Sequence, residues 1–204
     1  MLKKSFTKIT LLAILAGLTL AACGGSNSSG NSESGGTENS ESVQEDDCGG
    51  WTRTKPASQS EVIKCGDWEV SIEAAVNMPD SLILGQNSLN DVPKSGGKTV
   101  VVRLKATYNG SGSGDLYDVF GSGGGLIGLK GVRYEDNDPC CGSVWDAWAD
   151  ENEPFEGGTV MGNLFFITEP GDGEYLLALD FDSFDDVKAW ISITPIDDLA
   201  QINQ

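Results

Sequence analysis

The sequence predicts an all-β fold, an antiparallel β-sandwich, and three observations carry this prediction. Apolar and polar residues alternate along several short runs, which is the period of half-buried strands. Clusters of Gly, Asn, Asp and Pro separate these runs by hairpin-length gaps. Only two short stretches, residues 145–149 and 197–202, have a helical composition. Such a succession of strands favours two packed antiparallel sheets.

The N-terminus precedes this fold and has the features of a cleaved export signal. Lysines flank the start of the apolar stretch 9–20, which is too short to span a bilayer comfortably. Ala21 and Ala22 then lead to Cys23, an arrangement that resembles the lipobox of bacterial lipoproteins, whose thiol is acylated before the preceding segment is removed. We therefore expect residues 1–22 to be a lipoprotein signal peptide. Cys23 is the expected lipidation site, and its acyl chains, palmitate among them, are expected to anchor the protein to the membrane. The expected location of the protein is extracytoplasmic.

Residues 23–47 form the expected lipidated cysteine and its tether. From residue 24 onward this segment consists of Gly, Ser, Asn, Thr and acidic residues, with Val43 the one large apolar side chain. Such a composition buries too little apolar surface to order the chain. As a flexible coil it would span about 25–30 Å. Residues 48–204 remain as one folded domain, held away from the membrane.

The net charge of the chain excludes some classes of binding partner. The net charge is −18, and removal of the signal with its three lysines leaves −21. Nucleic acid and anionic lipid surfaces would be repelled, so we expect no nucleic-acid partner. The charge is compatible with cationic ligands or divalent ions, and solubility alone is its simplest explanation.

The strands are expected in order along residues 48–204. In 67–78 the expected apolar face consists of Trp68, Val70, Ile72, Ala74 and Val76. In 99–108 even-numbered apolar residues alternate with Val101, Arg103, Lys105 and Thr107. Further strands are expected at 126–129, 132–135, 160–168, 174–181 and 187–194. The glycine-rich stretch 121–125 is read as a flexible hairpin tip, because no Lys-Ser/Thr pair or strand-to-helix change follows it as a phosphate loop requires.

Three motifs in these strands resemble one family. They are Gly66-Asp67-Trp68-Glu69-Val70, the run 98–104 ending in Tyr108-Asn109-Gly110, and the run 156–166 with its Gly157-Gly158 turn. Together they are similar to the telokin-like, immunoglobulin-like domain of unknown function found in bacterial lipoproteins and secreted proteins, mainly of Gram-positive organisms. The resemblance covers about residues 65–194 and implies an immunoglobulin-like sandwich outside the cytoplasm. It implies no catalytic residues. Actinobacterial members often carry a cysteine near the position of Phe165, where this chain has phenylalanine, so their disulfide pattern does not transfer to it.

Four cysteines remain after Cys23, namely Cys48, Cys65, Cys140 and Cys141. An even number outside the cytoplasm indicates two disulfides. A bridge between the adjacent Cys140 and Cys141 would strain the peptide between them. We therefore expect Cys48 and Cys65 each to pair with one of those two. A zinc site of four thiolates is the weaker alternative, because the sequence lacks both a C-x-x-C pair and histidine.

Catalysis is not expected. The absence of histidine removes the commonest general base and the usual nucleophile–histidine pairs. The alternative is an envelope hydrolase, glycosidase-like, in which Asp146 acts with Asp150 or Glu151 beside Trp145 and Trp148. The two tryptophans could instead form a ligand-binding surface, but packing over one end of the sandwich is the simpler role for them.

An acidic loop offers a hypothesis for calcium. Glu135, Asp136 and Asp138 place oxygen ligands at close spacing, which suits calcium, although the glycine and the distal glutamate of an EF-hand are missing. Solvated turn residues are the simpler interpretation, and no cofactor is otherwise expected.

These observations predict a lipid-anchored, non-catalytic module that binds an unidentified envelope or extracellular partner at the cell surface. Loops on a rigid scaffold commonly carry recognition. We expect the site at one end of the sandwich, built from the loops 78–98, 109–125 and 135–155.

Overall fold

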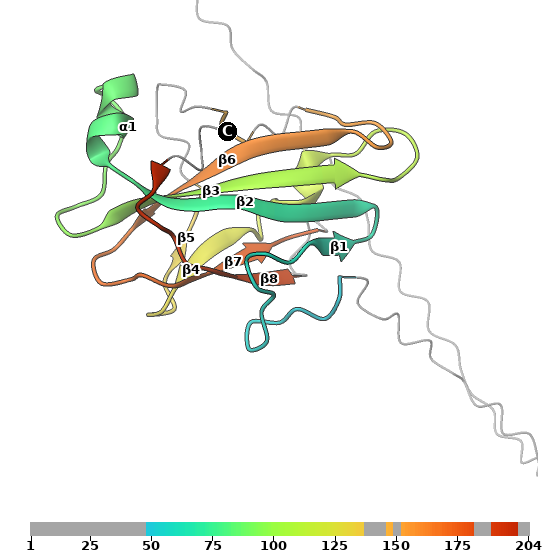
Figure 1. The fold of residues 1–204 in the computed structure, drawn as a ribbon, viewed down its shortest axis with the longest axis horizontal. Coiled ribbons are helices and arrows are strands. Elements are labelled where there is room, and N and C mark those ends of the chain that lie inside the picture. The colour runs from blue at the N-terminus through green and yellow to red at the C-terminus, as the bar shows by residue number, and fades with distance from the viewer. Residues whose placement is uncertain (1–47, 137–145, 149–151, 182–188, 200–204) are drawn as a thin grey trace, which may run out of the picture. The chain divides into compact units, whose positions relative to one another are not determined.

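The computed structural model describes residues 48–136, 146–148, 152–181 and 189–199. Their strands form two antiparallel four-stranded sheets, one above the other in Figure 1. The first sheet has the order β1 (Ile63–Cys65), β2 (Trp68–Met78), β3 (Lys98–Tyr108) and β6 (Thr159–Thr168). The second has the order β5 (Arg133–Tyr134), β4 (Gly125–Gly128), β7 (Tyr175–Leu179) and β8 (Ala189–Ile193). The fold is therefore the all-β sandwich that the sequence predicts.

Each of the seven expected strands has a counterpart within a few residues of its predicted ends. Three elements were not predicted from the sequence: β1 and two short helices, α1 (Asp80–Gln86) and the 3-10 turn η1 (Leu116–Asp118). Helical structure was predicted over 145–149, whereas Ala147 forms a parallel bridge with Asn163 of β6. Pro79 directly before an acidic first turn is the signal that could have revealed α1.

The main core lies between the two sheets. It is built from the inward side chains of both, including Val70, Leu104, Leu164, Phe166, Leu126, Leu177, Ile191 and Ile193, all fully buried. Burying one such side chain stabilises the fold by about 1.5–3 kcal/mol. This packing makes the sandwich a rigid frame for whatever its surface carries.

A β-bulge in β2 changes which side chains face this core. The register with β3 shifts between Ile72 and Ala74. Before the bulge Trp68 and Ile72 point into the sandwich, and after it Ala75 takes over. The prediction that Ala74 and Val76 share the inner face with Trp68 is wrong, because one extra residue reverses the alternation.

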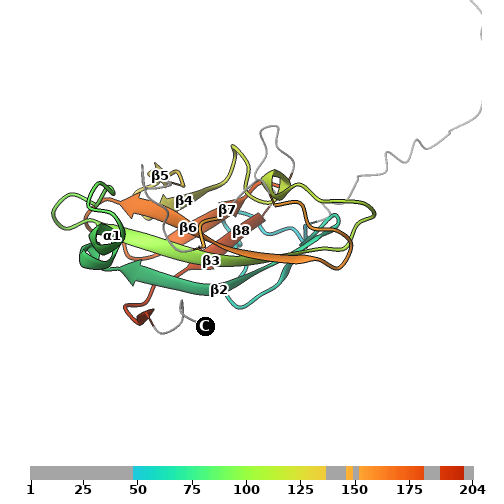
Figure 2. The same cartoon turned by 90° about the horizontal axis from the view of Figure 1, so that it is seen from above.

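The outer face of the first sheet is half covered. Ala74, Val76, Met78, Val101 and Phe165 form a second buried cluster there with Ile83 of α1, and Val92, Ala147 and Leu199 pack against it. The loop after α1 is fastened by Asn90, whose Nδ2 donates to the Ile83 carbonyl at 3.0 Å. In both views α1 lies at one end of the layers, the end where β2 finishes (Figures 1 and 2).

The prediction that the loops 78–98, 109–125 and 135–155 form one end of the sandwich is wrong for the first of them and is supported for the other two. Residues 79–97 precede β3 and residues 109–124 follow it, so β3 separates the two loops by its length of 11 residues, about 35 Å. The loop that lies with 109–124 is the one before β6, since Ser113 pairs with Phe155 and Gly114 N donates to the Pro154 carbonyl at 2.8 Å. The α1 end and the β6-start end are thus separate surfaces.

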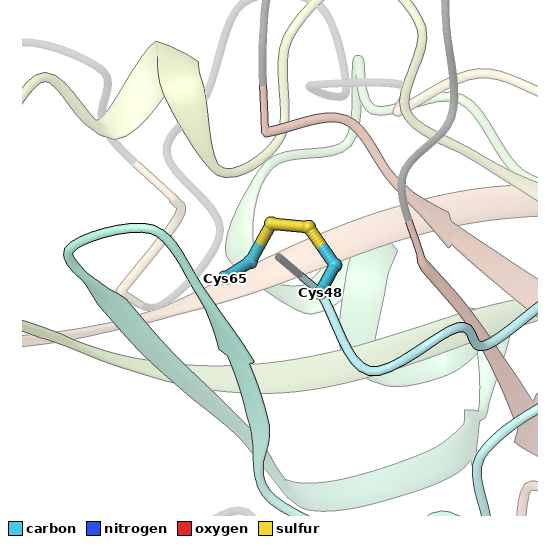
Figure 3. The surroundings of a disulfide bond; sticks show 2 residues. All are labelled: Cys48 and Cys65. Atoms are coloured by element: carbon cyan, nitrogen blue, oxygen red, sulfur yellow. A yellow bond between two sulfur atoms is a disulfide. The ribbon is translucent and has the colours of Figure 1, made fainter. Parts of the chain in front are cut away.

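Cys48 and Cys65 form a disulfide with each other across a sequence separation of 17 residues (Figure 3). The predicted pairing of each with Cys140 or Cys141 is therefore wrong, and so is a zinc site that uses all four thiolates. The reason is that β1 pairs with β2 and brings Cys65, opposite Trp68, to the point where the segment from Cys48 begins. Cys140 and Cys141 lie outside the described residues. The crosslink is local and ties the N-terminal segment to the edge of the first sheet.

Two sheet edges are partly covered by short parallel additions. Ala57 pairs with Ile191 of β8, and Ile196 pairs with Val76 of β2. Between the part of β2 that pairs with β1 and the contact with Ile196, the edge of β2 presents Ser71 and Glu73 at the bulge. A bulge and a charge are common devices against unwanted strand pairing.

Candidate surface at the start of strand β6

β6 is an edge strand of the first sheet, and every second residue of β6 directs its backbone N–H and C=O away from β3. Asn163 N donates to the Asp146 carbonyl at 2.7 Å, and Trp148 N donates to the Asn163 carbonyl at 2.9 Å. Phe165 N donates to Asp136 Oδ1 at 2.7 Å. In an antiparallel ladder, residues two apart direct their backbone groups the same way. Met161 therefore directs its N–H and C=O toward the same edge.

A shallow depression of about 480 Å³ lies beside this stretch. Its described lining residues are Asn152, Glu153, Pro154, Phe155, Gly158, Thr159, Val160 and Met161. Two large apolar side chains stand exposed around it, Phe155 at 69% and Met161 at 52%. Exposed apolar side chains that share one concavity are typical of a binding surface, whereas single ones are ordinary.

The position of Phe155 is set by a tight turn. Gly158 N donates to the Phe155 carbonyl at 2.6 Å, and Gly157 within this turn has φ +74°, a conformation that favours glycine. The turn is also joined to β3, since Gly157 N and Tyr108 N bond across to Tyr108 O and Gly158 O. Phe155 is thus held outward by the frame and does not depend on a loose loop.

The surroundings of the depression are polar and mostly acidic. Glu153 and Glu156 are exposed, and Thr159 shares a 2.9 Å hydroxyl contact with Thr107. Lys105 lies opposite Met161 in the register of β3 and β6 and is the neighbouring cation on the outer face. A ligand here would meet an apolar centre with the Glu153 carboxylate in its lining.

The predicted tryptophan surface has a different environment. Trp148 is only 9% exposed and belongs to the main core cluster. Its backbone lies directly over Gly162, where a Cβ would come within 2.7 Å of the Trp148 Cα. Trp148 thus takes the packing role that the sequence also allowed, with little surface left for a ligand, while Trp145 lies outside the described residues.

The carboxylates of the hydrolase hypothesis are not brought together in the part of the chain that the structure describes. Asp146 has a side chain 67% exposed, lies 3.6 Å from Arg103 and has a left-handed backbone with φ +45°. Asp150 and Glu151 lie outside the described residues. Glu153 is the one carboxylate among the described residues that line the depression. A pair of facing carboxylates, which glycoside hydrolysis needs, is not seen among them.

The acidic loop is also divided. Glu135 and Asp136 are exposed, and Asp136 uses Oδ1 to accept the hydrogen bond from Phe165 N. Asp138 lies outside the described residues. Among the residues that are described, no group of three His, Cys, Asp or Glu side chains is placed to hold a metal ion. The calcium hypothesis stays a prediction.

A buried polar pair that the sequence analysis did not single out lies at the other end of the sandwich. Tyr134 Oη donates to Asp172 Oδ2 at 2.7 Å, and both residues are less than 8% exposed. Burial, followed by the hydrogen bond to Asp172, raises the pKa of Tyr134 to about 12. Burial also raises the pKa of Tyr175, which donates to Thr168 Oγ1 at 3.2 Å. Both phenols therefore stay protonated donors and serve the fold.

Comparisons with known proteins add little to this geometry. No protein-family model matches the sequence, and no curated protein matches it. Among solved structures, a proposed lipoprotein (ycdA) from Bacillus subtilis is similar, with 18% identity and a TM-score of 0.45. The match covers 69% of this chain and 40% of that one, so the chain spans less than half of that protein. Within the described residues, no helix has the length and apolarity to cross a bilayer.

Proposed function

We propose that this chain is a lipid-anchored, extracytoplasmic protein that binds a partner at the cell surface and catalyses no reaction. Its folded part is an immunoglobulin-like domain of the telokin-like type, in keeping with the strand motifs in the sequence. The partner is a protein or another component of the envelope or its surroundings.

The anchor is supported by residues near the N-terminus. Small residues precede Cys23 after a lysine-flanked apolar run, and an acidic, Gly- and Ser-rich segment follows. A single acyl chain holds a protein to a membrane only marginally, whereas the two or three chains of a lipoprotein cysteine hold it stably. The tether would let the domain reach partners at some distance from the bilayer.

The observation that carries the binding role is the pairing of Phe155 and Met161 around one depression. These side chains expose most of their apolar surface while the frame beneath them is fully packed. Leaving such a concavity open favours association with a partner, because burial of apolar surface is what drives it. The described lining has a single carboxylate and no histidine, which favours binding over catalysis.

Two linked measurements test this proposal. Cys23→Ser in the full chain should abolish acylation and leave the protein unprocessed or released. A Cys23→Ser protein that still enters the detergent phase at mature size would overturn the anchor.

The second measurement tests partner binding. The full chain, crosslinked in intact envelopes and purified through a C-terminal tag, should retain a specific component, both with and without calcium. Failure to retain any component above the level of an unrelated lipoprotein would overturn the binding role.

A further inference from the structure

We propose that the depression at the start of β6 binds a cationic peptide segment of a partner, which inserts one large apolar side chain between Phe155 and Met161. This inference rests on the proposed binding function and names its site and ligand class. Three observations lead to it: the apolar pair, the volume and the charge.

The apolar pair and the volume define what enters. A depression of about 480 Å³ is large enough for an aromatic or branched aliphatic side chain. Phe155 and Met161 would lose their exposed surface on either side of it. Methionine adapts its shape to the partner, and phenylalanine adds a flat contact face. A shallow site of this kind suits one side chain of a longer segment better than an enclosed small molecule.

The charge defines the rest of the segment. Glu153 stands exposed in the lining of the depression, Glu156 is exposed in the turn that follows Phe155, and the whole chain carries −18. A segment with lysine or arginine next to its apolar residue would be attracted, and an acidic one would be repelled. Lys105 limits the acidic rim on the side of the sheet face, which places the cations of the ligand toward Glu153.

The test uses a fluorescent hexapeptide, Lys-Thr-Lys-Phe-Lys-Thr, and the purified full chain in detergent, with protein-free micelles as the blank. Fluorescence anisotropy should show saturable binding. Phe155→Ser should weaken it about tenfold or more, as truncation of a central apolar contact does. Leu129→Ser is the matched control, because Leu129 is 70% exposed but follows β4 at the other end of the sandwich. It should leave the affinity unchanged.

An acidic peptide isolates the contribution of charge. Glu-Thr-Glu-Phe-Glu-Thr should bind at least about tenfold more weakly, because it carries the same sign of charge as Glu153 and as the chain as a whole.

Three results would overturn the inference: no saturable binding, equal loss with Phe155→Ser and Leu129→Ser, or equal binding of the acidic peptide. A partner retained in envelopes despite these results would leave the proposed function standing and place its site elsewhere. Because Phe155 is exposed, Phe155→Ser should melt at the temperature of the unaltered chain, and this check separates lost binding from lost folding.

Discussion

The outer face of the first sheet has a covered half and an open half, and β6 runs through both. Phe165 and Met161 lie on the same face of this strand, four residues apart. Phe165 is 2% exposed and belongs to the cluster under α1, whereas Met161 is 52% exposed beside the depression. One strand thus contributes a core residue at one end and a surface residue at the other. The difference comes from α1 and the segments packed with it, which cover only one half.

The sequence of the neighbouring strand β3 shows the same division into a covered and an open half. On the outer face of β3, Val101 is followed by Arg103 and then Lys105, so that face changes from apolar to polar along the strand. Val101 is fully buried and the two cations are half-buried. A change from apolar to polar residues within one face indicates where a covering layer ends. A strand that is buried on both faces over part of its length therefore has more core residues than a simple alternation of apolar and polar residues predicts.

The largest expected effect comes from removing a residue of the covered half. Phe165→Ala should lower the free energy of unfolding by about 3–5 kcal/mol, because it leaves a cavity under α1. Met161→Ala should change it by less than about 0.5 kcal/mol. Urea unfolding of both variants measures this, and a similar loss in both would show that the two halves are not distinct.

The next largest effect on stability is expected from the disulfide, which lies at the end of the first sheet away from α1. Cys65→Ala should cost about 3 kcal/mol, since the disulfide closes a loop of 17 residues at the edge of the first sheet. Cys48→Ala and the double variant should lose the same amount. Non-reducing peptide mapping should join the peptides that hold Cys48 and Cys65, and a link from either to Cys140 or Cys141 would contradict the pairing.

A smaller effect is expected inside the α1 end. Tyr134→Phe should cost roughly 1–3 kcal/mol at neutral pH, because the buried carboxylate of Asp172 loses its donor. Tyr117→Phe is the control, since Tyr117 is 37% exposed. Thermal melts of the two variants should differ accordingly, and equal melting temperatures would show that the buried pair adds no stability.

The same tyrosine predicts a pH dependence. The pKa of Tyr134 is about 12 in the folded chain against an ordinary value of 10.0, so folding favours its neutral form. The corresponding stability is fully present below pH 10 and is lost as the pH rises toward 12. Tyr134→Phe should therefore lose less stability than the unaltered chain over this interval. A parallel decline in both would mean that Tyr134 does not carry the effect.

Much of the fold could be predicted because strand signals are local. Alternation and Gly-rich turns located β2 to β8, since each depends only on neighbouring residues. The misses are non-local. The bulge at Glu73 depends on the partner strand, and the disulfide depends on where β1 brings Cys65. The site was missed because Phe155 and Met161 gain meaning only when the turn at Gly157 sets them around one depression.

The most direct measurement is site-specific photocrosslinking of the full chain in intact envelopes. A photoreactive amino acid placed at position 161, in the open half, is compared with the same group at position 129, which is even more exposed but lies at the opposite end. We expect a discrete adduct with a partner from position 161 and none from position 129. Identical adducts from both positions, or an adduct from position 129 alone, would contradict it.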